Sequence, residues 1–251
     1  RRTRKRLNTP FGGIQVVFSG DFYQLPPVGN EDDPDSSAFC FESDSWDATF
    51  DTTVSLTRIF RQDDLAYAKV LNNIRVGKIT RKGLGLLTSR VGIQCEDELL
   101  RPTILMPRRR DVDRYNQAEL KKLDGEEHVF NVKVTRDSPM TTANSKPASQ
   151  FTDKQVEHEF AYLKTSMMAD QRLVLKEGTQ VMCVANVEME SGIVNGSQGI
   201  VQGFEDGFPL VKFRNGLLKQ VTPHTWSSDV VEGLGAQQVP LILAWAITIH
   251  K

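Results

Sequence analysis

The chain has 251 residues, of which 39% are hydrophobic and 25% charged, and its formal net charge is −1. These values are typical of a globular protein with one large domain or two modest ones. No apolar run reaches the roughly 18 residues that cross a bilayer, which argues against a membrane partner. Because the net charge is not positive, any contact with nucleic-acid phosphates has to come from local basic groups.

The ends of the chain and its cysteines carry little functional signal. The sequence begins with Arg1 rather than Met, and RRTRKRLN lacks the apolar core of a signal peptide, so we expect a fragment of a longer protein. Cys40, Cys95 and Cys183 form no Cys-x-x-Cys pair, and the histidines form no His-Glu-x-x-His pattern. These spacings predict neither a disulfide framework nor a metal site, and they weakly favour a reducing compartment.

The first third of the chain combines one apolar run with one helical pattern. Ile14 to Ser19 is apolar without polar alternation, which predicts a strand buried on both faces. Residues 29–38 form an acidic loop rich in turn formers. A helix is expected to begin after Asp63 or Asp64 as its cap and to end at Gly77.

A second strand and helix follow in the middle of the chain. Thr103 to Met106 lies between two prolines and predicts a parallel strand, and a helix is expected from about Asp111 to Leu123. Pro240 to Thr248 predicts another buried strand near the end of the chain. Strands followed closely by helices indicate an α/β fold with a parallel sheet.

The pattern changes after about Asp124. Residues 135–172 are polar and short of apolar periodicity, which predicts a flexible insertion. Short strands are then expected over residues 179–184, 199–204, 210–213 and 217–221. Asn215-Gly216 lies between the last two and indicates a hairpin. Short strands with tight turns predict a small β-barrel inserted into the α/β framework.

Polar residues follow the first apolar run directly. Ligands of open α/β sheets bind beyond the carboxyl ends of the strands, where Gly20, Asp21 and Gln24 fall. The Gln24 carboxamide can contact a phosphate oxygen and a water together, and Pro26-Pro27 would stiffen the chain after it. The alternative is a turn in which Asp21 caps backbone amides and Gln24 is solvated.

Basic and hydroxyl groups elsewhere offer further phosphate contacts. Arg61 could act as a finger on a transferring phosphate, or it could form an ion pair with a neighbouring aspartate. The glycine-rich stretch VNGSQG, residues 194–199, could admit a phosphate or could be an ordinary turn. Thr248, His250 and Lys251 follow the last apolar run and could hold a phosphodiester backbone.

The order of these segments resembles that of the Pif-type DNA helicases, in subgroup B of helicase superfamily one. PFGGIQVVFSGDFYQLPPV (Pro10 to Val28) is similar to the family's motif III. FCFESDSW and LTRIFRQDD resemble the segment that leads to motif IV. The family's order continues through LNNIRVG, RDVDRYN, LKEGTQVMCVANV, GIVNGSQGIVQGF and PLILAWAITIHK. The resemblance covers nearly the whole chain outside residues 135–172.

The resemblance implies two RecA-like domains with an inserted SH3-like barrel, which the family calls 2B. We expect residues 1–55 to end the first RecA-like domain (1A) and residues 56–123 to begin the second (2A). Residues 124–236 would form the 2B domain, with the flexible segment inside it. Residues 237–251 would return to domain 2A and begin motif V.

The resemblance also implies a role for each candidate residue. Gln24 would sense the γ-phosphate of ATP and Arg61 would be an arginine finger, so both are expected to be catalytic. Gly20 and Asp21 would shape the turn, and all four are expected to contact the nucleotide. The residues expected to contact DNA are Asn195 and Gly196 in the 2B domain and Thr248, His250 and Lys251 in motif V.

The implied enzyme hydrolyses ATP with magnesium and moves 5′ to 3′ along single-stranded DNA. Its partners would be single-stranded, forked duplex and G-quadruplex DNA, and it would act as a monomer. The family serves DNA repair, recombination and telomere maintenance in the nucleus or the mitochondrion.

Parts of the family pattern are not found in this sequence. It contains no Gly-x-x-x-x-Gly-Lys-Ser/Thr phosphate loop and no Asp-Glu magnesium strand before Ile14, nor the arginine that follows motif V in the family. We therefore expect this polypeptide alone not to hydrolyse ATP. Two alternatives stay open: a non-catalytic DNA-binding module left from a degenerate helicase, and the helicase part of a rolling-circle transposon.

Overall fold

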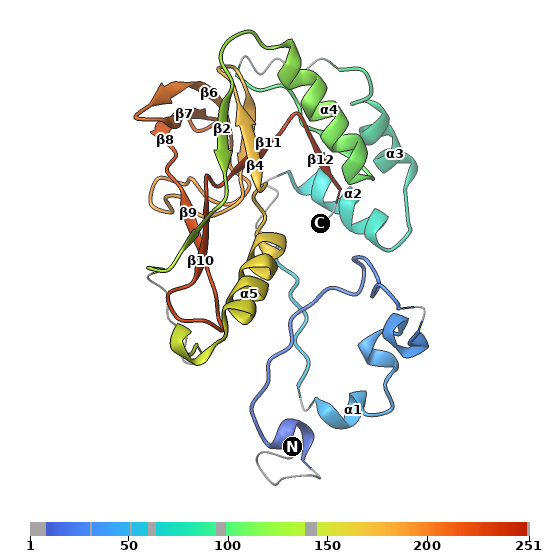
Figure 1. Cartoon of the computed structure of the whole chain (residues 1–251). Coiled ribbons are helices and arrows are strands. Elements are labelled where there is room, and N and C mark those ends of the chain that lie inside the picture. The colour runs from blue at the N-terminus through green and yellow to red at the C-terminus, as the bar shows by residue number, and fades with distance from the viewer. Residues whose placement is uncertain are drawn as a thin grey trace. The chain divides into compact units, whose positions relative to one another are not determined.

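The computed structural model describes residues 9–30, 32–50, 52–59, 64–93, 99–138 and 145–249. The chain divides into two compact units, residues 1–93 and 94–251 (Figure 1). Each unit has its own internal packing and is described by itself.

The described part of the first unit contains helices and irregular backbone. Its helices are η1 (Pro10–Gly12), η2 (Pro34–Ser37), η3 (Cys40–Glu42), α1 (Trp46–Thr49), α2 (Leu65–Arg75) and α3 (Arg81–Thr88). The Asp64 carboxylate caps α2, since its Oδ1 accepts from the amides of Ala66 and Tyr67 at 2.9 and 3.0 Å. Gly77 follows the helix with a φ of 70°. Both predicted boundaries of this helix are confirmed.

The predicted buried strand from Ile14 to Ser19 is wrong. The segment has no regular secondary structure, and Val17 is 86% exposed. A strand of a parallel sheet is stabilised by hydrogen bonds to its neighbours. The described residues of this unit include no strand that could pair with the segment, so its apolar side chains stay accessible.

Aromatic side chains hold the first unit together. The ring of Phe22 lies edge-on to Phe41 and Trp46, with centroids 4.9 and 6.0 Å away. Phe18 makes a similar contact with Phe50 at 5.1 Å. Each such pair contributes about 0.5–1.5 kcal/mol beyond area burial. The contacts of Phe22 join the GDFYQLPPV stretch to the FCFESDSW stretch.

The second unit contains a parallel strand pair with a helix, as predicted. Strand β1 (Ile104–Met106) pairs in parallel with β12 (Ala246–Thr248). Helix α4 (Arg109–Lys122) follows β1 and packs against β12. Val112 and Leu120 are the buried apolar residues of this helix. The mixed α/β class is therefore confirmed.

A five-stranded antiparallel sheet forms the largest part of the second unit. Its spatial order is β11 (Leu241–Leu243), β5 (Gln180–Cys183), β6 (Gln198–Glu205), β7 (Phe208–Phe213) and β8 (Leu218–Gln220). Gly216, with a φ of 86°, closes the predicted hairpin between β7 and β8. Asp206-Gly207, with φ values of 50° and 81°, turns β6 into β7; sequence reasoning missed this second Asx-Gly signal.

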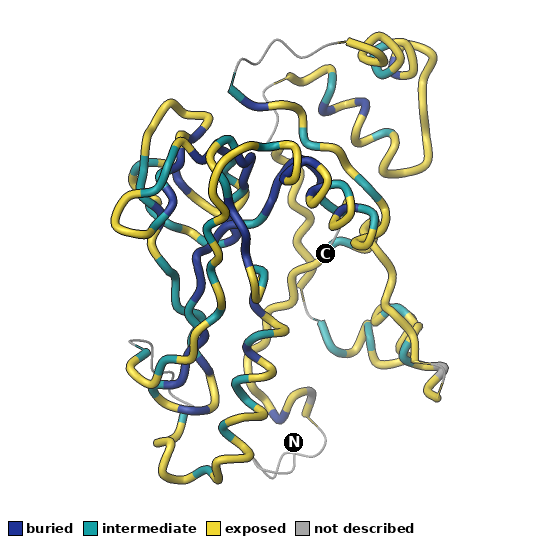
Figure 2. Tube along the Cα trace, turned by 45° about the horizontal axis from the view of Figure 1, so that its top comes forward, coloured by how far each residue is buried: buried dark blue, intermediate teal, exposed yellow. Residues whose placement is uncertain are grey.

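The main hydrophobic core lies on this sheet, and Figure 2 shows in dark blue which residues of the chain are buried. Phe213, Val211, Val201 and Leu241 are at most 1% exposed. Strands β2 (His128–Asn131) and β4 (Arg172–Leu175) form an antiparallel pair whose Leu173 and Leu175 add to the same core. Each Å² of apolar surface removed from water contributes about 25 cal/mol to folding, so the burial of these side chains is the main favourable contribution to the stability of the unit.

A smaller core lies beside a three-stranded sheet. The strands are β3 (Lys133–Thr135), β10 (Gly235–Gln238) and β9 (His224–Ser227), with β10 in the middle. Helix α5 (Asp153–Ser166), preceded by η4 (Ala148–Gln150), packs against β10. The core residues are Leu163, Met167, Val231, Leu234 and Ala236.

Helix α5 differs from the expectation of a flexible segment over residues 135–172. Thr152 and Gln155 form a capping box at its start. Val156, Phe160 and Leu163 face the small core, at helical spacings of four and three residues. Polar residues between them hid this periodicity in the sequence. Residues 139–144 lie outside the described part of the chain.

The predicted strand from Pro240 to Thr248 is buried but is not one strand. Its first half is β11, antiparallel to β5, and its second half is β12, parallel to β1. The chain leaves one sheet and enters the other at Ala244-Trp245, both at most 7% exposed. Among the described helices, none combines the length and apolarity that a membrane span needs.

Candidate functional site

Gln24 and Asp21 form a small polar group with Arg75 in the first unit. The Gln24 Nε2 donates to Asp21 Oδ2 at 3.2 Å, and the Tyr23 amide donates to Asp21 Oδ1 at 3.0 Å. The Arg75 guanidinium, from the last turn of α2, donates to the same Oδ1 at 2.5 Å. It also lies 5.0 Å from the centre of the Tyr23 ring.

These hydrogen bonds explain the ionisation of Asp21. The amide of Tyr23 lowers the pKa of the carboxyl most, with further lowering by the Gln24 carboxamide and the Arg75 guanidinium. Asp21 therefore accepts hydrogen bonds from three neighbours, among them a backbone amide, as expected for the alternative in which it caps a turn. Gly20 is exposed, and nothing lies within 4 Å of the position of a Cβ there.

The residues present fit one part of a nucleotide site. An exposed carboxamide and a half-exposed guanidinium lie together, and both groups can donate to phosphate oxygens. A cradle of backbone amides, which phosphate loops supply, is not part of this group. Arg61 lies outside the described residues, so its predicted role stays a prediction. Arg75 was not among the predicted residues.

The glycine-rich stretch of residues 194–199 leads into β6, whose first two residues it includes, and borders a hollow. The Gly196 amide donates to the Cys183 carbonyl at 2.9 Å, and its φ of 93° suits glycine. The Asn195 amide donates to Asn186 Oδ1 at 3.0 Å. The hollow has a volume of about 560 Å³ and is lined by Gly192, Gly196, Ser197, Gln198, Phe213, Arg214 and Asn215. The turn expected as the alternative is present, and it leaves Asn195 exposed.

Thr248 ends β12 and is half-buried. The next amide, of Ile249, donates to the Met106 carbonyl at 3.1 Å, which extends the parallel pair by one bond. Thr248 and the exposed Ile249 therefore lie at the carboxyl end of a parallel strand, where ligands of such sheets bind. His250 and Lys251 lie outside the described residues.

A buried carboxamide fixes the backbone before Thr248. Asn116, on α4, is 5% exposed. Its Nδ2 donates to the carbonyls of Ala246 and Leu243 at 2.9 and 3.3 Å, and its Oδ1 accepts from the Ala246 amide at 2.8 Å. This residue is the last of the RDVDRYN stretch, one of the segments that resemble the helicase family.

A second buried carboxamide joins the two sheets. Gln180, on β5, is 2% exposed. Its Nε2 donates to the carbonyls of Arg101 and Ala244 at 2.9 and 3.1 Å, and its Oε1 accepts from the Arg101 amide at 3.2 Å. Thr103 Oγ1 also donates to the Ala244 carbonyl, at 2.8 Å. Sequence reasoning missed both amides, because their partners are distant along the chain.

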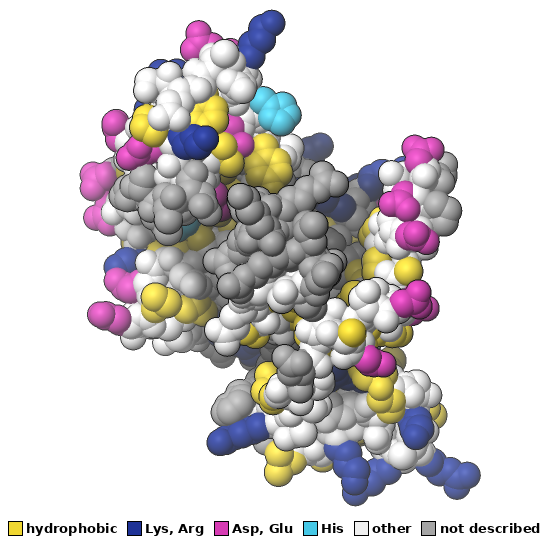
Figure 3. Space-filling view, turned by 90° about the horizontal axis from the view of Figure 1, so that it is seen from below, with side chains coloured by type: hydrophobic (Ala, Val, Ile, Leu, Met, Phe, Trp, Pro, Cys, Tyr) yellow, Lys and Arg dark blue, Asp and Glu magenta, His cyan; other side chains and the backbone are white. Residues whose placement is uncertain are grey.

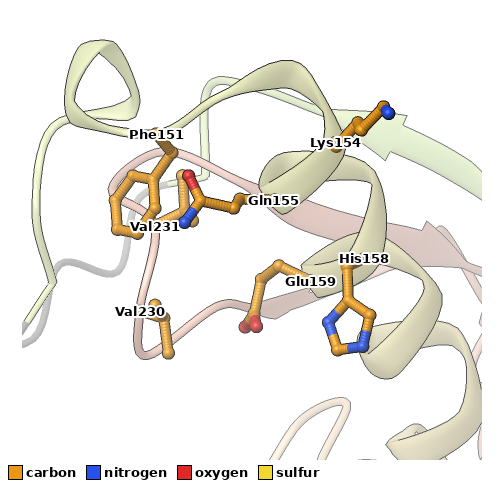
Figure 4. Close-up of a pocket in the computed structure, with 7 residues that line it drawn as sticks. All are labelled: Phe151, Lys154, Gln155, His158, Glu159, Val230 and Val231. Atoms are coloured by element: carbon orange, nitrogen blue, oxygen red, sulfur yellow. The ribbon is translucent and has the colours of Figure 1, made fainter.

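A further hollow lies against the start of α5 (Figure 4). Its volume is about 310 Å³, and it is lined by Phe151, Lys154, Gln155, His158, Glu159, Val230 and Val231. Glu159 accepts a hydrogen bond from Ser228 at 2.6 Å, and Gln155 closes the capping box of the helix. Two of its polar groups thus already have partners in the fold.

Figure 3 shows both basic and acidic side chains on the surface of one face of the molecule, and the net charge of the chain is −1. Over the described ranges, no group of three or more His, Cys, Asp and Glu residues is placed to hold a metal ion. The candidate ligand contacts are therefore the individual polar groups at turns, loops and strand ends, such as Gln24, Asn195 and Thr248.

Two family models match the chain. The model described as PIF1-like helicase matches residues 1–83. The model of the 2B domain of the DNA helicase Pif1 matches residues 160–204. Together they cover slightly more than half of the chain.

Relatives and solved structures agree with these models. The human ATP-dependent DNA helicase PIF1 is 34% identical over 260 residues, which cover 100% of this chain and 36% of that protein. The Saccharomyces cerevisiae ATP-dependent DNA helicase RRM3 is 34% identical over 217 residues, 85% of this chain and 27% of its own. The Bacteroides Pif1 complex with ADP-AlF4 superposes with a TM-score of 0.72 at 29% identity, covering 97% of this chain and 54% of that one. Candida albicans Pif1 superposes with a TM-score of 0.63 at 31% identity, covering 97% and 57%.

The proteins it matches are named DNA helicases, and the chain shares the mixed α/β fold of their solved, RecA-like structures. The chain belongs to the PIF1-like helicase family. It spans about a third of the length of the curated relatives it matches most fully.

Proposed function

We propose that this chain is part of an ATP-dependent DNA helicase that moves 5′ to 3′ along single-stranded DNA. The observation that carries the proposal is the exposed Gln24 carboxamide, which Asp21 orients beside the Arg75 guanidinium. Such a group can respond to a phosphate, because a carboxamide and a guanidinium both donate to phosphate oxygens.

The nucleotide would be ATP with magnesium, and the roles divide by residue. Gln24 would sense the γ-phosphate, while Gly20 and Asp21 shape the turn that presents it. Arg61 would act as an arginine finger, which stabilises the charge that develops in phosphoryl transfer. A phosphate loop is needed for turnover and is not in this sequence, so hydrolysis would require a polypeptide that contains one.

Single-stranded DNA is the proposed partner of the second unit. Bacteroides Pif1 has been solved bound to single-stranded DNA, and two Pif1 helicases have been solved at forked duplex DNA. By analogy, Asn195 and Gly196 would contact the DNA backbone from the proposed SH3-like 2B domain. Thr248, His250 and Lys251 would contact it from motif V at the end of β12.

The cellular role follows from the family. We infer unwinding of forked duplexes and G-quadruplexes by a monomer, in DNA repair, recombination and telomere maintenance. The nucleus and the mitochondrion are the proposed compartments. The proposed domain boundaries stay those of the sequence analysis: 1A over residues 1–55, 2A over 56–123 and 237–251, and 2B over 124–236.

DNA-stimulated ATP hydrolysis tests the proposal, in a polypeptide that joins this chain to a phosphate loop. Gln24→Ala should abolish most of the stimulation and leave DNA affinity nearly unchanged. Arg61→Ala should lower kcat more than it changes nucleotide affinity, because a finger acts on the transition state. Gln117→Ala, on the exposed side of α4, is the matched control. Stimulated turnover by Gln24→Ala equal to that of the parent would refute the assignment.

A further inference from the structure

Two successive hydrogen bonds link the glycine-rich loop to Ala244, and the backbone continues from Ala244 into the strand that carries Thr248. The first of them begins at Gln198, the fifth residue of VNGSQG and the first of β6. The Gln198 Nε2 donates to Thr103 Oγ1 at 3.1 Å. Thr103 stands directly before β1, so this bond, like those of Gln180, connects the antiparallel sheet to the parallel pair.

Thr103 also binds Ala244, where the chain leaves β11 and approaches β12. Its hydroxyl donates to the Ala244 carbonyl at 2.8 Å, and the Gln180 carboxamide donates to the same oxygen at 3.1 Å. Ala244 is fully buried, so its carbonyl depends on these protein donors. The Ala244 amide in turn donates to the Gln180 carbonyl at 2.9 Å.

The remaining step leads from Ala244 to Thr248. Asn116 holds both the amide and the carbonyl of Ala246, two residues before Thr248. From there the parallel ladder with β1 fixes the strand up to the Ile249 amide. The Thr103 hydroxyl connects the two segments, because it accepts a hydrogen bond from Gln198 of the loop and donates one to Ala244, which leads to β12.

We propose that Thr103 is a positioning residue that holds the loop of residues 194–199 and the end of β12 in a fixed mutual arrangement. A hydroxyl is suited to this place, because it accepts one hydrogen bond while it donates another. Valine has the same shape but can do neither. The inference rests on the proposed function only in assuming that residues 194–199 and the end of β12 contact the same DNA strand.

Hydrogen exchange on the purified chain tests the positioning without any ligand. In Thr103→Val, the Gly196 and Ile249 amides should both exchange about three to ten times faster, because each segment loses a hydrogen-bonded restraint. The Val221 amide, which donates to Pro209 at 2.8 Å beside the far edge of the sheet, should not change. Thr103→Ser keeps the hydroxyl and should restore parental exchange. Thr165→Val removes a hydroxyl that donates only to Tyr162 within α5, and it should leave all three reporters unaltered.

Acceleration at only one of the two segments, or at neither, would overturn the proposal. If Thr103→Val also accelerates Val221, the whole unit has been loosened and Gln198→Leu becomes the deciding variant. It removes the loop's bond to Thr103 but leaves the bond from Thr103 to Ala244. In it Gly196 must still exchange faster while Val221 stays protected; parental exchange at Gly196 would overturn the proposal.

DNA binding separates this inference from the proposed function. The affinity of the chain for a fluorescent oligothymidine should fall about three- to tenfold in Thr103→Val and return in Thr103→Ser. Parental affinity in Thr103→Val would show that the arrangement held by Thr103 does not matter for DNA binding, and would overturn that part of the proposal. If the parental chain does not bind the oligonucleotide while the exchange results hold, the arrangement stands and the assignment of these segments to DNA fails.

Discussion

Removal of the Asn116 carboxamide should destabilise the second unit far more than removal of an exposed asparagine. Asn116→Ala deletes three hydrogen bonds and leaves the amide and carbonyl of Ala246 and the carbonyl of Leu243 without this partner. Ala246 is fully buried and Leu243 is 7% exposed, so water cannot easily replace the lost donor. A buried polar group left unpaired costs about 1–3 kcal/mol. With partial relaxation, we expect a total loss of about 3 kcal/mol.

A loss of that size is readily measured by calorimetry. For a domain of this size, 1 kcal/mol corresponds to roughly 2–4 °C in Tm, so Asn116→Ala should lower Tm by about 6–12 °C. The matched control is Asn215→Ala, which removes a bond to Ser191 at 3.1 Å and one from Leu217 at 3.2 Å. Because Asn215 is exposed, its loss should stay below about 1 kcal/mol. Equal shifts in the two variants would refute the reasoning from burial.

Three further predictions concern the reactivity of Cys40 and Cys183, the start of α5, and His224. Burial raises the pKa of the Cys183 thiol to about 12. Iodoacetamide at pH 8 should therefore alkylate the exposed Cys40 and spare Cys183. Modified Cys183 in the folded chain, detected by peptide mass spectrometry, would contradict this. Thr152→Ala should cost about 1 kcal/mol by removing the N-cap of α5, measured by urea unfolding; an unchanged midpoint would mean that the cap adds no stability. Burial lowers the pKa of His224, so the unfolded chain binds the proton more readily and stability falls as the pH drops through about 6.5. His224→Gln should flatten this decline between pH 7.5 and 5.5, and parallel profiles would exclude His224 as its source.

Elements with strong local signals were predictable from the sequence. The cap at Asp64 and the stop at Gly77 lie next to the helix they delimit, and Asn215-Gly216 forms its turn from its own backbone preferences. The pairing of β1 with β12 was not predictable in the same way. Only their shared apolar character indicated one sheet.

The wrong predictions have a common physical cause, which is that apolar character does not specify a partner. Ile14 to Ser19 has the composition of a buried strand, yet the described part of its unit offers no strand to pair with. Pro240 to Thr248 has the same composition and is divided between two sheets, because Asn116 and Gln180 bind the backbone at the switch. Both side chains come from distant parts of the sequence.

In the candidate site too, contacts between residues close in sequence were predictable and contacts between distant residues were not. Gln24 and Asp21 are near neighbours, so a turn that brings them together could be inferred from the sequence. Arg75, 54 residues after Asp21, was missed because only the folded chain brings α2 to this turn. A basic residue in the last turn of the predicted helix was the one available signal.

Binding of single-stranded DNA by the 251-residue chain is the most direct test of the account. A fluorescent oligothymidine should bind, with an affinity that falls as salt rises because phosphate contacts release counterions. Asn195→Ala and Thr248→Ala should each weaken binding, whereas Asn215→Ala should not. If the folded chain does not bind at low salt, or if it binds equally well after both substitutions, the assignment of these two segments to DNA is contradicted.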